Sequence, residues 1–172
     1  MEQKNNLFIK NENRPTTKTN IIFIVMFVFL TLFDQWTKWL AVRHLTNNDI
    51  PLIQGVLELH YLENRGAAWG MLQNQTWFLV IIPILVLIAL IYGYLQLPAE
   101  KKYTLLRFSL ILLAAGAVGN FIDRLINRYV VDFIYFSLID FPVFNVADCY
   151  VCISSALILY CILIKHRDDN LL

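Results

Sequence analysis

The chain has 172 residues, of which 58% are hydrophobic and 16% are charged. Soluble domains carry about a quarter charged residues, so this composition indicates a membrane protein, and the length suggests one compact unit. The net charge of +1 creates no basic field, which excludes nucleic acid as an expected partner.

Residues 1–20 are polar and partly basic, and we predict that they form a disordered cytoplasmic tail. An apolar run then extends from Ile21 to Phe33 and leads into polar residues, without the small-residue cleavage site of a secretory signal. The run is therefore predicted to remain in the protein as a transmembrane helix over residues 21–42, because a span needs roughly 20 residues.

The segment 43–75 interrupts the hydropathy. Leu57, Leu59 and Tyr61 alternate with polar residues, which is the period of a β-strand, and nearby prolines and glycines favour turns. We predict a small β-rich lobe that rests on the outer surface of the membrane. Within it, the glycines and alanines of residues 64–70 allow a ligand or another backbone to come close.

Three more apolar stretches predict further spans, separated by a short charged loop and by a second polar connection over residues 127–143. The expected fold class is an all-α membrane protein: four transmembrane helices with a small β-rich outer lobe, in a single domain over residues 21–165. A cytoplasmic tail is expected at residues 166–172. The three further helices are predicted over residues 76–96, 103–126 and 144–164.

The distribution of basic residues predicts the orientation. Most of the 14 Lys and Arg residues lie in the two tails and around the loop between the second and third helices. The positive-inside rule therefore favours cytoplasmic termini and puts both polar connections on the outer side. The inner basic residues are Lys4, Lys10, Arg14, Lys18, Lys101, Lys102, Arg107, Lys165 and Arg167.

Four aspartates are then expected near the outer face, where an acid in hydrocarbon is costly and indicates function. Asp34 and Lys38 have the spacing to pair on one helix face. Asp123, beside Arg124, is interpreted as an ionised structural strut. The other two aspartates are Asp132, in the second connection, and Asp148, in the first turn of the last helix.

Asp132 has apolar neighbours and no adjacent cation, which favours its protonated form. Two close carboxyl groups share a proton, so Asp132 and Asp148 can act as acid and base in peptide hydrolysis without a metal or cofactor. From spacing alone, Asp123 with Asp148 is a second possible pair. Asn145 can orient Asp148 or hold a substrate backbone, and Arg124 can hold a carbonyl or phosphate oxygen.

Other reaction classes lack their motifs in this sequence. The scattered histidines form no H-E-x-x-H zinc motif, and no G-x-S-x-G nucleophile motif, P-loop or dinucleotide-binding motif occurs. Cys149, Cys152 and Cys161 lie in one apolar segment, so we interpret them as small buried hydrophobes. No metal and no cofactor are expected.

Five blocks of sequence, taken together and in order, resemble the lipoprotein signal peptidases (signal peptidase II) of bacteria over roughly residues 30–165. Each block alone is weak evidence, whereas their combination across four helices is specific. Trp69 departs from the family, which most often has Phe there, and Cys149 stands where Ser or Thr is common. The blocks are Asp34-Gln35-Trp36-Thr37-Lys38, Asn64-Arg65-Gly66-Ala67-Ala68-Trp69, Gly119-Asn120-Phe121-Ile122-Asp123-Arg124, Val130-Val131-Asp132-Phe133 and Phe144-Asn145-Val146-Ala147-Asp148.

The resemblance implies an aspartic endopeptidase of the cytoplasmic membrane. It would remove the signal peptide from diacylglyceryl-modified prolipoproteins by cutting just before the lipidated cysteine. Its partners would be the prolipoprotein and membrane lipid, and the enzyme is expected to be a monomer. The outer lobe looks like the β-cradle of the family, and residues 127–143 look like its mobile outer flap.

The resemblance also implies roles for individual residues, with Asp132 and Asp148 as the catalytic pair. The expected substrate-binding residues are Asn64, Gly66, Asn120, Arg124 and Asn145. The expected supporting residues are Asp34, Lys38, Asp123 and Ala147.

Other functions stay open from the residues alone. A small transporter or proton-relay subunit also uses intramembrane acids, although it would spread them over several depths. In a membrane scaffold the polar loops would be incidental. Among enzymes, an acyl or phospholipid transferase is a further alternative.

Overall fold

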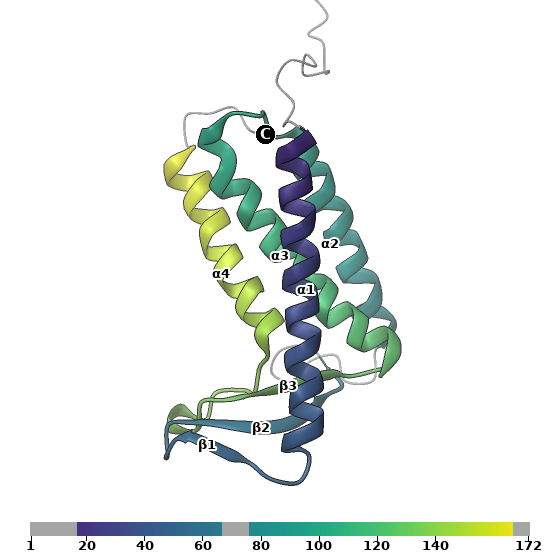
Figure 1. The fold of residues 1–172 in the computed structure, drawn as a ribbon, viewed down its shortest axis with the longest axis vertical. Helices are drawn as coiled ribbons and strands as arrows, with labels where there is room; N and C mark the ends of the chain where they lie inside the picture. The colour runs from purple at the N-terminus through teal and green to yellow at the C-terminus, as the bar shows by residue number, and fades with distance from the viewer. Residues whose placement is uncertain (1–16, 67–75, 167–172) are drawn as a thin grey trace, which may run out of the picture.

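The structure is a computed structural model that describes residues 17–66 and 76–166. Within this part of the chain, four long helices stand side by side, and a small sheet lies across one end of the bundle (Figure 1). The η3 turn (Lys101–Tyr103) precedes the third long helix, and the η5 π-helical turn (Cys161–Lys165) extends the fourth. The long helices are α1 (Thr17–Leu45), α2 (Thr76–Gln96), α3 (Thr104–Ile126) and α4 (Val146–Tyr160).

Each of the four helices is long and apolar enough to cross a membrane when α3 is taken together with η3 and α4 together with η5. Many large apolar side chains on their outer faces are exposed, such as Phe29 and Leu85 at 63% and 60%, as lipid-facing residues would be. The predicted fold class is confirmed. The helix α1 begins four residues before the predicted start, so residues 17–20 are helical, whereas residues 1–16, with most of the expected tail, lie outside the described part.

The sheet joins the two polar connections, which the sequence analysis placed on the same side of the membrane. It is antiparallel, in the order β1-β2-β3, and its third strand comes from the 127–143 connection, where we expected a mobile flap. In the register of β2 and β3, Leu62 pairs with Asp132 and Asn64 with Val130. Asp132 is therefore held in a sheet beside Asn64. The strands are β1 (Ile50–Ile53), β2 (Leu57–Asn64) and β3 (Val130–Tyr135).

The last turns of α1 anchor the sheet to the bundle. Ala41 and Leu45 form a buried apolar cluster with Val131 and Phe133 of β3. At about 25 cal/mol per Å² of buried apolar surface, such a cluster stabilises the contact between helix and strand. The strand that contains Asp132 is thus fixed to a membrane helix.

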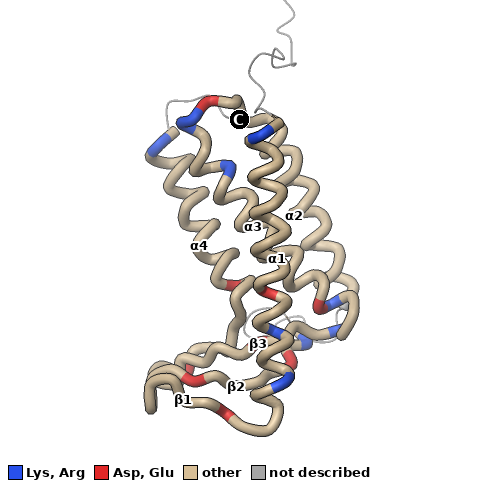
Figure 2. Tube along the Cα trace, in the orientation of Figure 1, with Lys and Arg blue, Asp and Glu red and all other residues tan. Residues whose placement is uncertain are grey.

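Charges divide the bundle along its length. Figure 2 shows mostly basic positions at the end away from the sheet, and both acidic and basic positions near the sheet. Between these two zones the described helices are apolar, which matches the hydrocarbon thickness of a bilayer.

The end of the bundle away from the sheet is closed around Arg107. Its side chain is buried, and the guanidinium donates hydrogen bonds to the carbonyl oxygens of Leu97, Pro98 and Glu100. The last carbonyls of a helix have no partner within the helix, so this arginine satisfies groups that follow α2. The sequence analysis counted Arg107 only as an inner basic residue and missed this role.

The helix α3 packs against the other three helices, and Gly119 lies on it next to Asp34 and Ala147. A Cβ at Gly119 would overlap Asp34 Oδ2, whereas a Cβ at Gly93, on α2, would meet nothing within 4 Å. We expect Gly119→Ala to destabilise the protein by about 1–3 kcal/mol, as overpacking does in other cores.

The matched control for this prediction is Gly93→Ala, which adds the same methyl group to another helix in open space. Its stability is expected to stay the same or to rise, by up to about 1 kcal/mol, because alanine favours helix. Unfolding in mixed micelles with increasing dodecyl sulfate measures both variants. Equal stabilities for the two variants would contradict the close contact at Gly119.

Candidate active site

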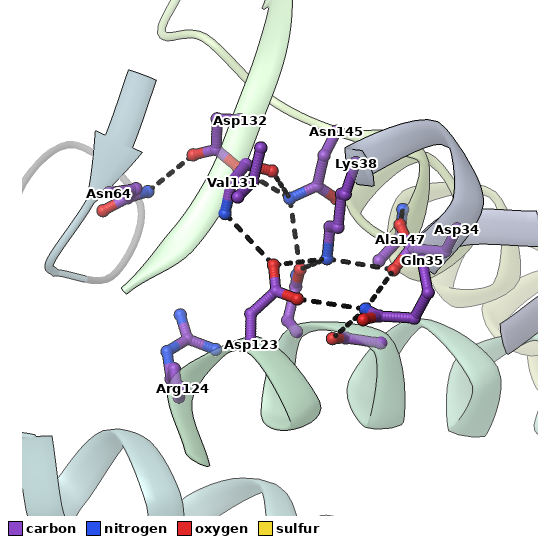
Figure 3. A network of polar contacts seen from close by, with 12 residues as sticks. Asp34, Gln35, Lys38, Asn64, Asp123, Arg124, Val131, Asp132, Asn145 and Ala147 are labelled. Carbon is purple, nitrogen blue, oxygen red and sulfur yellow. Dashed lines mark hydrogen bonds and ion pairs between the residues drawn. The ribbon is translucent and has the colours of Figure 1, made fainter. Parts of the chain in front are cut away.

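Asp132 lies on β3 and is almost completely buried, at 1% exposure. Two amide side chains donate to its carboxyl group, from opposite sides (Figure 3). Asn64 Nδ2 on β2 is 2.8 Å from Oδ2, and Asn145 Nδ2 is 2.6 Å from Oδ1. The position of Asp132 is therefore fixed by the neighbouring strand and by the start of α4.

Asp148 is oriented by the way in which α4 begins. Asn145 is extended and is the N-cap residue of the helix. Its Oδ1 accepts a hydrogen bond from the Asp148 backbone N–H at 3.0 Å, and Asp148 Oδ2 accepts one from the Asn145 N–H at 3.1 Å. This is a capping box, which satisfies two backbone donors at the helix start. Asn145 therefore holds Asp148 through the backbone of each residue, and its side-chain amide does not contact the Asp148 carboxylate directly among the described contacts.

Two amides connect the pair of aspartates. Asn120, on α3, donates to Asp148 Oδ1 at 2.7 Å, and its own Oδ1 accepts from Asn145 Nδ2 at 3.1 Å. Asn145 is completely buried and also donates to Asp132. The chain of hydrogen bonds therefore runs from Asp132 through Asn145 and Asn120 to Asp148.

A buried cation lies behind these amides. Lys38, 2% exposed, has its Nζ 2.9 Å from Asp34 Oδ2 and 3.1 Å from Asp123 Oδ2, and it donates to Asn120 Oδ1 at 2.8 Å. The predicted pairing of Asp34 with Lys38 is confirmed. Asp123, interpreted from the sequence as an ionised strut beside Arg124, forms its ion pair with Lys38 in the described part of the structure.

Gln35 belongs to the same cluster, and the sequence analysis missed it. Its Nε2 lies 3.0 Å from both the Gly119 carbonyl oxygen and Asp123 Oδ1, and 3.3 Å from Asp34 Oδ2. Its position in the sequence could have identified it: Gln35 is a polar amide next to Asp34 within an apolar helix, and a buried amide without a hydrogen-bond partner is costly.

The two acids around Lys38 also hold the backbone of the site. Asp123 Oδ2 accepts a hydrogen bond from the Val131 N–H at 3.1 Å, and Asp34 Oδ1 accepts one from the Ala147 N–H at 2.8 Å. Val131 and Ala147 are the residues immediately before the two paired aspartates. The ionic cluster therefore fixes the main chain that carries both carboxyl groups.

Arg124 and Gly66 meet at one edge of the site. Arg124 Nη2 is 3.4 Å from the Gly66 carbonyl oxygen, and the Gly66 N–H donates to Asn64 Oδ1 at 3.0 Å. Among the residues that the structure describes, Arg124 Nε has no hydrogen-bond partner although it is buried. Trp69, at the end of this sequence block, lies outside the described residues.

A pocket of about 880 Å³ opens in front of the paired aspartates and brings most of the predicted residues together. Among the polar residues expected to act in catalysis or substrate binding, Asn145 is the exception, because it is buried behind the carboxyl groups. The wall is otherwise largely apolar, with residues from β2, α4 and the connection before α4. The predicted residues on the wall are Asn64, Asn120, Arg124, Asp132 and Asp148, and the apolar ones include Leu62, Phe141, Val143, Phe144 and Ile153.

The pocket alters the acidity of Asp132. Burial, and then the negative charge of Asp148, raise the pKa of the Asp132 carboxyl group to about 7. The hydrogen bonds that Asn64 and Asn145 donate act in the opposite direction and lower it. The expected tendency of Asp132 to hold a proton is thus supported by its surroundings.

Solved structures with the same fold define the class of protein. One bacterial membrane enzyme, determined by the in meso method at 2.3 Å resolution, is 34% identical, with a TM-score of 0.76 over 92% of this chain and 94% of that one. A second, at 1.9 Å resolution, is 35% identical, with a TM-score of 0.72 over 88% and 97% of the two chains. The fold is that of a multi-pass bacterial membrane enzyme.

The sequence comparisons give the family. The family model for signal peptidase (SPase) II matches residues 26–164. A lipoprotein signal peptidase of Caldanaerobacter subterraneus is 42% identical, over 83% of this chain and 96% of that protein, and one of Streptococcus pyogenes serotype M1 is 39% identical, over 86% and 95%. The chain belongs to the signal peptidase II family and is a membrane protease. The relatives support this function and not the transporter or proton-relay alternative.

Proposed function

We propose that the protein is an aspartic endopeptidase that acts on diacylglyceryl-modified prolipoproteins and cuts just before the lipidated cysteine. The observation that carries the proposal is the placement of Asp132 and Asp148 on one pocket wall, linked by two buried amides. This pocket lies where the apolar helices meet the polar sheet. A substrate that is part lipid and part peptide fits such a boundary.

In the proposed reaction, Asp132 starts protonated and Asp148 starts ionised. Asp148 takes a proton from a water molecule, whose oxygen attacks the carbonyl carbon of the scissile bond. Asp132 donates its proton to the carbonyl oxygen. The tetrahedral intermediate then breaks its C–N bond, and the amine leaves with the proton that Asp148 had taken. One hydroxyl group of the intermediate returns its proton to Asp132 as the bond breaks, so the product is a carboxylic acid and both aspartates regain their starting states. No covalent enzyme intermediate forms.

The remaining polar residues of the pocket are proposed to position the substrate. Asn64, Asn120 and Arg124 face the pocket, and Gly66 lies next to Arg124. The unpaired Nε of Arg124 gives it capacity for a further acceptor, such as a substrate carbonyl oxygen. Asn145 is proposed to orient the two carboxyl groups instead of contacting substrate, because it is buried behind them.

Asp34, Lys38, Asp123 and Ala147 are proposed to support the site. Their contacts with Asn120 and with the backbone before each aspartate support this role. The alternative pair of Asp123 with Asp148 is disfavoured, because Asp123 is engaged by Lys38, Gln35 and the Val131 N–H.

For topology, we propose that both termini are cytoplasmic and that the sheet and pocket face outward. The largely basic end of the bundle in Figure 2 supports this orientation by the positive-inside rule. We further propose that residues 21–165 act as a single protease domain and that the protein works as a monomer.

The test of the proposed function uses purified protein and a synthetic peptide that carries a diacylglyceryl cysteine after an apolar signal segment. Mass spectrometry of the products is expected to show one cut, on the N-terminal side of the modified cysteine. The same peptide without lipid is the matched control and is expected to be cut poorly. A cut elsewhere, or equal cutting of both peptides, would contradict the proposed substrate.

The pH dependence of this cleavage is expected to follow Asp132. Since Asp132 must hold its proton to donate it, kcat/KM should fall as pH rises above about 7, by up to tenfold per pH unit. Asn64→Leu removes a hydrogen bond that lowers the Asp132 pKa, so the falling limb should move to higher pH.

The control is Asp49→Asn, which neutralises an exposed acid that pairs with His60 and does not line the pocket. In this variant the fall of kcat/KM with rising pH should occur at the same pH as in the original protein. A limb that is unmoved in Asn64→Leu, or that moves to lower pH, would remove Asp132 as the group responsible.

A further inference from the structure

Two of the three cysteines lie on the pocket wall, and the proposed reaction does not use them. Cys149 directly follows Asp148, and Cys152 lies near it on α4. Both line the pocket that Asp132 and Asp148 also line, and both are free thiols. The expectation that all the cysteines are buried small hydrophobes is therefore wrong for this pair.

The position of Cys152 relative to Asp148 matters most. The two residues are i and i+4 on one helix, so they are neighbours on the same face, about 6 Å apart along the axis. Cys152 is exposed, whereas Cys149 is half-buried. A group attached to the sulfur of Cys152 would project into the pocket within one helical turn of the aspartate.

The surroundings of these thiols select the kind of molecule that reaches them. Cys152 and Ile153 line the pocket at a level deeper in the bundle than Asp148, on a helix whose outer face is apolar. Phe141, Val143 and Phe144 add to the apolar wall. A small, uncharged molecule that dissolves in the membrane is favoured there over an ionic one.

We propose that Cys152, with Cys149 as a second acceptor, is a covalent modification site for apolar α,β-unsaturated carbonyl compounds, and that the adduct closes the active-site pocket. The sulfur forms a bond to the β-carbon, the carbon–carbon π bond breaks, and the thiol proton goes to the α-carbon. Nothing is oxidised or reduced. The effect of the adduct on cleavage rests on the proposed function, whereas the modification itself does not.

Cys161 provides a control inside the same protein. It lies on η5 with its side chain completely buried against Leu97, Tyr103 and Leu106, at the end of the bundle away from the sheet. It is a free thiol of the same chain, in the same detergent, without access from the pocket. Modification that depends only on thiol chemistry would reach Cys161 as well.

The experiment treats the full chain with N-ethylmaleimide in detergent micelles and follows two readouts over time. Peptide mass spectrometry is expected to show the adduct on Cys152 first and none on Cys161 until the protein is denatured. Cleavage of the lipidated peptide is expected to slow by at least about tenfold as the adduct forms. The double variant Cys149→Ser, Cys152→Ser should retain most of its own untreated rate after treatment, whereas Cys161→Ser should behave like the original chain.

Two results would overturn the proposal. One is a folded protein whose Cys152 and Cys149 stay unmodified under conditions that label them after denaturation. The other is complete modification of Cys152 while the cleavage rate stays within about twofold of the untreated rate. If the untreated protein does not cut the lipidated peptide, the proposed function fails, and the mass measurement still decides whether the site is modified.

Discussion

Replacement of either aspartate of the pair by asparagine is expected to abolish cleavage of the lipidated peptide. Asp132→Asn removes the proposed proton donor, and Asp148→Asn removes the proposed base, without changing the size of either side chain. General acid–base groups contribute about 10²–10⁴-fold each, so kcat should fall on the order of 10³-fold or more in each variant. Single-turnover assays with excess enzyme measure this loss.

Both variants are expected to fold and to bind the lipidated peptide. The Asp132 side chain lies between two amide donors, and the asparagine oxygen can still accept from one of them. Fluorescence anisotropy of a labelled lipopeptide measures binding, which should change by less than about tenfold. Cleavage by Asp132→Asn or by Asp148→Asn at more than about a tenth of the original rate would exclude that residue from the chemistry.

The alternative pair supplies the matched comparison. Asp123→Asn removes a carboxylate that holds Lys38 and the Val131 N–H but does not line the pocket. It is expected to lower stability as well as activity. An Asp123→Asn protein with normal stability and binding but no turnover would instead make Asp123 a catalytic residue.

Hydropathy and helical spacing predict most of the fold because they depend on neighbouring residues. The four helices follow from apolar runs of sufficient length, and the pairing of Asp34 with Lys38 follows from the turn of one helix. Both features are local. The capping of α4 by Asn145 is local too, which is why its contact with Asp148 was predictable.

What the sequence did not reveal depends on contacts between distant segments. Residues 130–135 form the third strand of the sheet only because β2 offers an unpaired edge. The paired residues of the two strands are at least 66 positions apart in the chain, the separation of Asn64 and Val130. Gln35 reaches Gly119, which is 84 positions away. Neither contact has a signature in local periodicity, so each needed the three-dimensional arrangement.

Lys38→Met is the second change for which we expect a large effect, because it removes the cation that several parts of the site share. Asp34 and Asp123 would be left as buried acids without their counter-ion. Breaking a buried ion pair by removing one partner typically costs about 3–5 kcal/mol. Unfolding in mixed dodecyl sulfate micelles should show a loss of this size.

The same variant tests whether Lys38 also positions the catalytic groups. Its ammonium donates to Asn120 Oδ1, and this orients the amide so that Nδ2 faces Asp148 Oδ1. Without Lys38, Asn120 Oδ1 keeps only the hydrogen bond from Asn145 Nδ2, so the amide can shift. A displacement of about 1 Å in an active site can cost on the order of 10²-fold. Turnover is therefore expected to fall by that factor in the fraction of Lys38→Met that remains folded.

A neutral version of the cluster separates the two roles. The triple variant Asp34→Asn, Lys38→Met, Asp123→Asn has no uncompensated buried charge, so it should recover most of the stability that Lys38→Met loses. Its cleavage rate should stay low, because Asn120 still lacks the hydrogen bond from Lys38 and keeps only the one from Asn145. If turnover returns together with stability, Lys38 acts only on the fold. If stability returns and turnover does not, the cation reaches the reacting carboxyl groups through Asn120, and the ionic cluster below the pocket is part of what makes the pair of aspartates work.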